Sequence, residues 1–179
     1  MGHRTTGRFL AYVLRHNPAA AGIELDNNGW ANVGELLDGV QRSGRSIDIT
    51  KLEEIVVTDD KCRFSFNEDK SRIRANQGHS IDVDLELEEK TPPDVLYHGT
   101  AEKYIESIKQ NGIQKRTRRF VHLSITEQAA LKVGSRHGEP IVLKIDAKQM
   151  YSDGYKFYLS ENGVWLTDNV PFKYVTEMK

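Results

Sequence analysis

A proline break near the middle of the chain limits what this sequence can fold into. Residues 81–88 alternate apolar and acidic side chains, and the following segment, 89–93, closes with Pro92 and Pro93. Alternation is typical of a half-buried strand, whereas proline cannot donate to a sheet ladder and stiffens a connection. The sequence therefore predicts a strand over 81–88 and two domains, 1–90 and 91–179, each long enough to bury a small core.

Composition excludes several classes of protein. No stretch approaches the roughly 18 consecutive apolar residues of a membrane span, and the first residues contain no apolar signal core. Cys62 is the only cysteine, which rules out an internal disulfide framework and a cysteine-based zinc cluster. The histidines lack compact ligand spacing, so we expect no metal centre. We expect a cytoplasmic protein without a membrane partner.

The formal net charge of −1 conceals a small asymmetry between the two halves. Residues 1–90 carry 12 basic and 16 acidic side chains, whereas residues 91–179 carry 13 basic and 10 acidic ones. Neither half has the strongly basic composition of a protein that coats nucleic acid. A polyanionic partner would therefore be bound by a few placed cations rather than by the overall field.

The pattern of elements predicts an α+β fold without regular βαβ repetition. In the first half, an apolar helical face over 9–14 ends before Pro18, and helix starts capped at Asn32 and Thr50 precede a hairpin over 62–75. Small helices followed by a hairpin are typical of a winged-helix-like unit. The second half predicts strands at 94–98, 120–123 and 141–145, short helices at 104–112 and 124–133, and a hairpin turn at 161–163.

Arginine and histidine recur beside small or turn-forming residues in four clusters, 14–18, 73–80, 97–100 and 134–140. Arginine in such places can direct two hydrogen bonds to one phosphate, each worth roughly 1.5–3 kcal/mol. Each cluster also has an ordinary structural interpretation. A cation in the last turn of a helix stabilises the helix dipole, and a strand or loop arginine is often merely solvated. A histidine on a strand is often a hydrogen-bonded core residue, so none of the clusters determines a function alone.

Taken together and in this order, the motifs resemble the RNA 2'-phosphotransferase family, over about residues 10 to 140. The resemblance implies a winged-helix-like N-terminal lobe and a C-terminal lobe with the split sheet of an ADP-ribosyltransferase fold. The matching segments are Leu14-Arg15-His16-Asn17-Pro18, Arg74-Ala75-Asn76-Gln77-Gly78-His79-Ser80, His98-Gly99-Thr100, Val121-His122-Leu123-Ser124 and Gly134-Ser135-Arg136-His137-Gly138.

The resemblance also implies a reaction. An internal 2'-phosphate of a tRNA-like RNA would be transferred to NAD through an ADP-ribosylated 2'-phosphate, and NAD would be consumed. The products would be RNA with a free 2'-hydroxyl, nicotinamide and ADP-ribose 1'',2''-cyclic phosphate. The expected partners are therefore 2'-phosphorylated RNA and NAD, and the expected form is a monomer.

Site residues are carried over from the family's motifs one by one. The resemblance assigns the N-terminal lobe to the RNA phosphate and the C-terminal lobe to NAD. The implied catalytic residues are Arg15, His16, Arg74 and Arg136. The implied NAD-binding residues are His98, Gly99, Thr100, His122, Leu123, Ser124, Gly134 and Ser135. Aromatic candidates to cover the NAD rings are Tyr97, Tyr104, Phe120 and Trp165.

These residue types suit a reaction between two phosphate-bearing molecules. Guanidinium groups remain charged at any working pH and reduce the repulsion between two anions. His16 would act as a general acid or as a hydrogen-bond donor to phosphate, and the sequence leaves both roles open. The basic loop 115–119 is a hypothetical track for RNA backbone phosphates.

Two alternatives remain open at this stage. The first is a binding module without catalysis, in which the N-terminal half recognises nucleic acid and the C-terminal half senses a ligand. The second keeps the NAD chemistry but changes the acceptor to a terminal phosphate of a nucleic acid, a small phosphorylated molecule or water.

Overall fold

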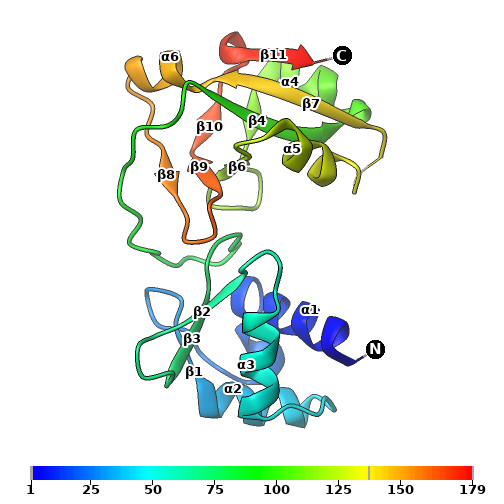
Figure 1. Cartoon of the computed structure of the whole chain (residues 1–179), viewed down its shortest axis with the longest axis vertical. Helices are drawn as coiled ribbons and strands as arrows, with labels where there is room; N and C mark the ends of the chain where they lie inside the picture. Colours follow the sequence, from blue (N-terminus) through cyan, green and yellow to red (C-terminus); the bar gives the residue numbers. More distant parts are fainter. Residues whose placement is uncertain (1, 137, 179) are drawn as a thin grey trace. The chain divides into compact units, whose positions relative to one another are not determined.

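The structure is a computed structural model that describes residues 2–136 and 138–178, and it divides into two compact units, 1–86 and 87–179 (Figure 1). Both units combine helices with small antiparallel sheets, which confirms the predicted α+β class. His137, which belongs to the last sequence motif, lies outside the described residues.

The N-terminal unit contains three α-helices, one 3-10 turn and a three-stranded antiparallel sheet with strand order β1-β3-β2, among the described residues. Its elements are α1 (Gly2–Arg15), η1 (Pro18–Ala21), β1 (Ala31–Asn32), α2 (Val33–Arg42), α3 (Ile49–Val57), β2 (Phe64–Phe66) and β3 (Arg72–Ala75).

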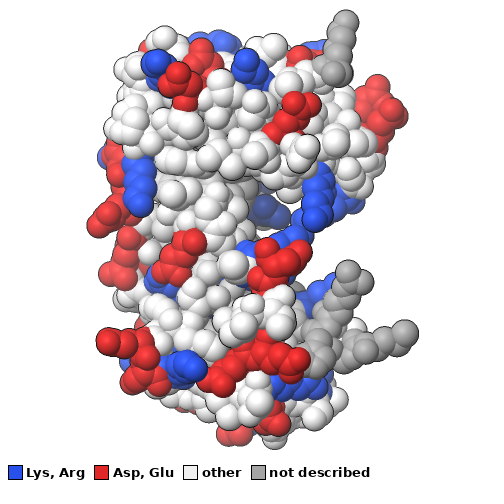
Figure 2. Space-filling view, in the orientation of Figure 1, with Lys and Arg blue, Asp and Glu red and all other residues white. Residues whose placement is uncertain are grey.

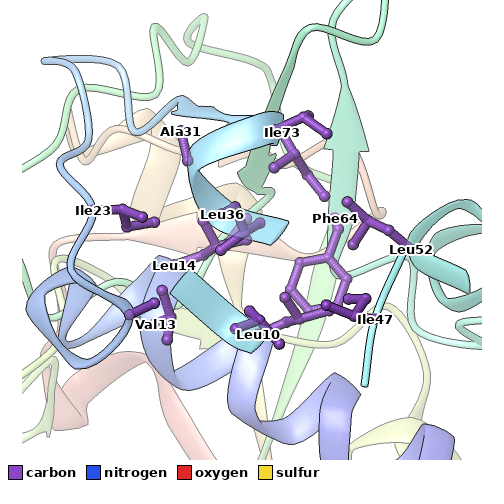
Figure 3. Packing of buried hydrophobic residues seen from close by; sticks show 14 of the residues in the cluster. Leu10, Val13, Leu14, Ile23, Ala31, Leu36, Ile47, Leu52, Phe64 and Ile73 are labelled. Carbon is purple, nitrogen blue, oxygen red and sulfur yellow. The ribbon is translucent and has the colours of Figure 1, made fainter. Parts of the chain in front are cut away.

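The core of this unit forms between the apolar face of α1 and the inner face of the sheet. Leu10 and Leu14 are fully buried one helical turn apart, as residues four apart on one helix face should be. Figure 3 shows them with Leu36 of α2, Phe64 of β2 and Ile73 of β3. The helix therefore ends with its last residues fixed against the core.

Helix caps follow the sequence prediction in one case and differ in the other. Asn32 caps α2 as predicted, because its side-chain oxygen accepts a hydrogen bond from the backbone amide of Glu35 at 3.1 Å. The predicted cap at Thr50 is wrong, because Asp48 accepts from the amide of Lys51 at 2.8 Å and α3 already begins at Ile49. Asp48 has the extended backbone that an N-cap requires, and Thr50 lies within the first turn.

The predicted hairpin is confirmed, with β2 and β3 antiparallel and Phe64 opposite Ala75. Alternation along β3 buries Ile73 and Ala75 and places Arg74 on the other face of the sheet. The four residues of β3 therefore have two roles. Ile73 and Ala75 contribute to the core, and Arg74 places a positive charge on the opposite face of the sheet.

The predicted strand over 81–88 is wrong. Burial does alternate along this segment, and Val83 is only 4% exposed. Its backbone nevertheless forms no ladder within the described chain, and Asp84 instead donates to the carbonyl of Asn27 at 2.7 Å. Glu86 has a positive φ of 54°, which interrupts the extended backbone. Alternation reports which side chains are covered, whereas a strand also requires a partner strand.

Within its described residues, 87–136 and 138–178, the C-terminal unit contains two three-stranded antiparallel sheets, ordered β11-β7-β4 and β6-β9-β8, and the pair β10-β5. Its strands are β4 (Val95–Ala101), β5 (Ile113–Gln114), β6 (Val121–Leu123), β7 (Pro140–Asp146), β8 (Tyr158–Leu159), β9 (Trp165–Thr167), β10 (Asn169–Val170) and β11 (Val175–Met178). Its helical segments are η2 (Glu102–Tyr104), α4 (Ile105–Asn111), α5 (Glu127–Gly134), α6 (Ala147–Ser152) and η3 (Phe172–Tyr174).

The two three-stranded sheets of this unit are joined at one point. Tyr97 of β4 and Ser124, which follows β6, exchange backbone hydrogen bonds of 2.8 and 2.7 Å. The bridge fixes the end of β6 beside the middle of β4. It therefore brings the His-Gly-Thr and His-Leu-Ser motifs together.

Helix α5 packs on β4 through two glycines. A Cβ on Gly99 would lie 1.7 Å from the carbonyl oxygen of Ala130, and one on Gly134 would lie 2.5 Å from the carbonyl oxygen of Thr100. Neither position tolerates a side chain while the backbones stay in place. The glycines therefore set the close approach that places Arg136 just beyond the end of α5.

Acidic and basic side chains are interspersed on the molecular face shown in Figure 2. Within residues 2–136 and 138–178, no helix is both long and apolar enough to cross a bilayer.

Candidate functional site

Arg15 and His16 stand where α1 ends, and the loop after β3 packs against them. The backbone amide of Ser80 donates to the carbonyl of Arg15 at 3.0 Å. The Ser80 hydroxyl also lies 2.9 Å from Nδ1 of His16. The Leu-Arg-His and Gln-Gly-His-Ser motifs, 64 residues apart, therefore form one local structure.

Gly78 lets this loop lie close to the Arg15 guanidinium. Its φ is +90°, and a Cβ there would be 3.6 Å from Cζ of Arg15. His79 is 2% exposed and anchors the loop in the unit, whereas Nε and one terminal nitrogen of Arg15 are buried. Burial on several sides fixes the guanidinium far more firmly than an ordinary surface arginine.

Arg74 is held by an aromatic ring. Its Cζ lies 4.5 Å from the centre of the Trp30 ring, which is cation–π geometry. Trp30 precedes β1, which pairs with β3, so sheet formation brings the two side chains together. Leu14, next to Arg15, packs in the same core as Ile73, next to Arg74. Both cations therefore stand at the border of one core.

In the C-terminal unit, His98 and His122 come together through the junction of the two sheets. Nδ1 of His98 lies 3.1 Å from the carbonyl oxygen of His122, and because a carbonyl only accepts, the ring donates there through a proton on Nδ1. Burial lowers the pKa of His98, the bond to the His122 carbonyl opposes this, and the charge of Arg118 lowers it again. The lowered pKa favours the neutral form of the His98 ring.

Arg118 joins this group from the basic loop. Its Nη1 is 3.4 Å from Nδ1 of His122. Part of its side chain is exposed, yet burial of the guanidinium lowers the pKa of Arg118, and the like charge of Arg136 lowers it further. Arg118 and Arg136 therefore add positive charge of the same sign to this part of the unit, and an anion bound between like charges would relieve their repulsion.

The other predicted NAD-binding residues have varied surroundings. Thr100 is buried on β4, and Ser135 is exposed, with its hydroxyl donating to the carbonyl of Leu131 at 2.8 Å. Leu123 is a core residue, 1% exposed, and Ser124 forms the sheet junction through its backbone. Among the aromatic candidates, Trp165 is in the core, whereas Phe120 packs against Tyr158 at 5.4 Å between ring centres.

Side chains of the basic loop 115–119 make specific contacts within the unit, whereas its sequence alone is typical of a solvated loop. Lys115 pairs with Asp168, and Arg116 stacks over the Tyr104 ring with Cζ 5.0 Å from its centre. Arg118 turns toward His122 instead. Sequence reasoning placed Arg118 only on an RNA track and did not place Ser80 beside His16. Ser80 lies within a motif and Arg118 lies just before one, and these positions were the only indication of their roles that the sequence contained.

The predicted catalytic residues are distributed over both units. Arg15 and His16 are brought together with Gly78 and Ser80, and Arg74 lies at the same core's border, all in the N-terminal unit. Arg136 lies in the C-terminal unit with Arg118. Each group combines guanidinium and imidazole, and such a donor set suits phosphate or pyrophosphate.

Comparison with known proteins gives a consistent result. Residues 2–169 match the sequence model of the RNA 2'-phosphotransferase, Tpt1 / KptA family. A probable RNA 2'-phosphotransferase of Fusobacterium nucleatum is 55% identical over 170 residues, covering 94% of this chain and 95% of the relative. A second, of Flavobacterium johnsoniae, is 51% identical over 172 residues, covering 96% and 94%.

A third relative with the same description, from Acaryochloris marina, is 48% identical over 176 residues, 98% of this chain and 97% of its own length. The range matched by the family model extends over both units and includes the segment from 14 to 136 that contains the arginine and histidine motifs. The chain therefore belongs to the RNA 2'-phosphotransferase family.

Proposed function

We propose that this protein transfers an internal 2'-phosphate of RNA to NAD. The RNA leaves with a free 2'-hydroxyl, and the other products are nicotinamide and ADP-ribose 1'',2''-cyclic phosphate. The proposal is supported by the family match over residues 2–169, and chiefly by the grouped arginines and histidines around Arg15 and Arg118.

In this proposal the N-terminal unit is the winged-helix-like lobe and binds the RNA 2'-phosphate. Arg15 and Arg74 bind its oxygens, and His16 donates a hydrogen bond or a proton to it. Two observations support the roles of the arginines: Arg15 is held beside Gly78, and Arg74 stacks on the Trp30 ring. Anchored guanidinium groups lose little entropy when a phosphate binds, so more of each bond's free energy appears as affinity.

The C-terminal unit is then the ADP-ribosyltransferase-like lobe that holds NAD. The junction of its two small sheets presents His98 and His122, and Arg118 and Arg136 bring the positive charge that a pyrophosphate or phosphate requires. Thr100 and Ser135 contribute from β4 and from the end of α5. Gly99 and Gly134 act through packing, because they hold α5 against β4.

The chemistry needs these charges in two steps. In the first, an oxygen of the 2'-phosphate attacks the C1 carbon of the nicotinamide ribose and nicotinamide departs. In the second, the neighbouring ribose hydroxyl attacks the phosphorus and the RNA 2'-oxygen leaves with a proton. The first step requires an anion to approach another anion, which guanidinium groups permit. The second requires proton transfer, for which an imidazole is suited near neutral pH.

The direct test incubates the protein with NAD and an oligoribonucleotide carrying one internal 2'-phosphate. We expect nicotinamide, dephosphorylated RNA and the cyclic phosphate in equal amounts. Omitting NAD should abolish all three. Dephosphorylation without NAD, or release of inorganic phosphate, would overturn the proposal.

Matched acceptors separate this function from its alternatives. Oligonucleotides with a 5'- or 3'-terminal phosphate, and the unphosphorylated RNA, replace the substrate in parallel reactions. Faster turnover of a terminal phosphate would identify a different acceptor. Binding of nucleic acid with no NAD turnover on any acceptor would identify a non-catalytic module.

A further inference from the structure

We infer that Ser80 is a positioning residue for His16, because its hydroxyl holds the imidazole ring through Nδ1 and directs Nε2 toward the transferred phosphate. The inference rests on the proposed function, in which His16 acts on that phosphate. It adds a residue of the N-terminal unit whose side chain acts through His16 rather than on the substrate.

The contact is held at two points. The Ser80 hydroxyl is 2.9 Å from Nδ1 of His16, and the Ser80 amide donates to the carbonyl of Arg15 at 3.0 Å. The backbone bond fixes residue 80 at the end of α1 whichever side chain it carries. Replacing the hydroxyl should therefore remove the interaction with His16 and leave the loop in place.

His16 is exposed, so packing alone does not define the orientation of its ring. It directly follows the last residue of α1, and its backbone amide donates to the carbonyl of Tyr12 at 2.9 Å. The ring of Tyr12 lies beside the His16 ring, at 6.4 Å between ring centres with an interplanar angle of 41°. This contact restricts the movement of the imidazole but does not determine which way its two nitrogens face. A hydrogen bond to Nδ1 selects one orientation and leaves Nε2 pointing away from Ser80.

A serine hydroxyl is suited to a ring that changes its protonation state. It both donates and accepts hydrogen bonds. When Nε2 gives up its proton, Nδ1 keeps its own, so the Ser80 hydroxyl accepts from Nδ1 in both the charged and the neutral ring, and the hydrogen bond survives both states. A carboxylate in the same place would favour the imidazolium form only. The Ser80–His16 pair thus fits a histidine that donates a proton and recovers it within one catalytic cycle.

The test compares Ser80→Ala with Ser80→Thr in the full chain, using the 2'-phosphorylated oligoribonucleotide and NAD. Ser80 is exposed, so the threonine methyl group has room and the hydroxyl is kept. We expect Ser80→Ala to lower kcat by about five- to tenfold, the usual worth of one neutral hydrogen bond, with little change in KM for NAD. Ser80→Thr should recover most of this loss.

Ser71→Ala is the matched control, because the Ser71 hydroxyl also makes a surface hydrogen bond, to Asp69 at 2.6 Å in the β2–β3 turn. It should leave kcat unchanged. Equal kcat for wild type and Ser80→Ala, or equal losses in the alanine and threonine variants with unchanged melting temperatures, would overturn the inference.

A second measurement does not depend on turnover. The nitrogen-15 shifts of the His16 ring report which nitrogen carries the proton, and we expect Ser80→Ala to change the Nδ1 to Nε2 ratio while Ser71→Ala does not. Unchanged His16 shifts in Ser80→Ala would overturn the positioning role. If the His16 shifts change in Ser80→Ala but the wild type has no activity, the positioning role stands and the proposed function fails. The two failures are therefore distinguishable.

Discussion

A side-chain carbon on Gly99 would lie 1.7 Å from the carbonyl oxygen of Ala130, so β4 and α5 pack as they do because residue 99 is a glycine. The obstructing atom belongs to the backbone and cannot turn aside as a side chain can. The arrangement of α5, and with it the position of Arg136, depends on this close approach.

Gly99→Ala should therefore destabilise the C-terminal unit by about 3 kcal/mol, the upper end of the usual cost of overpacking. Urea unfolding followed by Trp165 fluorescence in a Trp30→Phe background measures this unit. Lys132→Ala in the same unit is the control, because Lys132 is an exposed residue of α5 and alanine favours the helix. A stability for Gly99→Ala equal to wild type would contradict the packing argument.

Arg118 should matter for activity beyond its charge. Arg118→Ala is expected to lower kcat/KM by about 100-fold or more, as removal of a donor to a developing charge commonly does. Arg118→Lys should recover only part, because lysine keeps the charge without the planar fork. Lys148→Ala, which removes an exposed ion pair with Asp94, serves as the control. Turnover by Arg118→Ala within twofold of this control would exclude the role.

His98 should make stability depend on pH. Burial lowers its pKa from the ordinary 6.5, so below that value the unfolded chain binds a proton that the folded chain resists. Stability is therefore full above pH 6.5 and falls as the pH decreases toward the lowered pKa. His98→Asn keeps a donor for the His122 carbonyl but cannot titrate. The loss of stability between about pH 7 and about pH 5 should be smaller in this variant, as urea midpoints will show.

The two candidate caps of α3 can be separated by mutation. Asp48→Ala should cost about 1 kcal/mol, because the amide of Lys51 loses its acceptor. Thr50→Ala should change the free energy of unfolding by less than half as much, since Thr50 lies inside the helix. Thermal unfolding followed by circular dichroism compares them. A larger effect at Thr50 would restore the sequence-based assignment.

The basic loop should contribute to RNA binding through Arg116 and Arg119. Replacing both with glutamine should weaken binding of a single-stranded oligoribonucleotide. The plot of log affinity against log salt should become shallower by about 0.7 for each RNA phosphate that is no longer neutralised. Fluorescence anisotropy over a range of salt concentrations measures the slope. An unchanged slope would show that these two side chains do not bind the RNA backbone.

The sequence by itself determined the α+β class, the apolar face of α1, the β2–β3 hairpin and the short helices of the second half. These depend on periodicity and on turn and cap residues, which act between neighbours in the chain. The predictions that were wrong also came from these local patterns. Residues 81–88 carry the alternation of a strand, but a ladder requires a partner that no local pattern supplies. The sequence pattern pointed to Thr50 as the cap of α3, whereas the extended backbone at residue 48 makes Asp48 the cap.

The motifs also marked the candidate site residues, but only the tertiary structure decided what each one touches. Ser80 reaches His16 across 64 residues, and Gly99 meets Ala130 because two separate elements pack. Arg118 turns its guanidinium toward the ring of His122, with Nη1 at 3.4 Å from Nδ1, although it belongs to an exposed loop. Interactions of this kind depend on how cores and sheet junctions close, and burial then changes the charge and freedom of the groups they enclose.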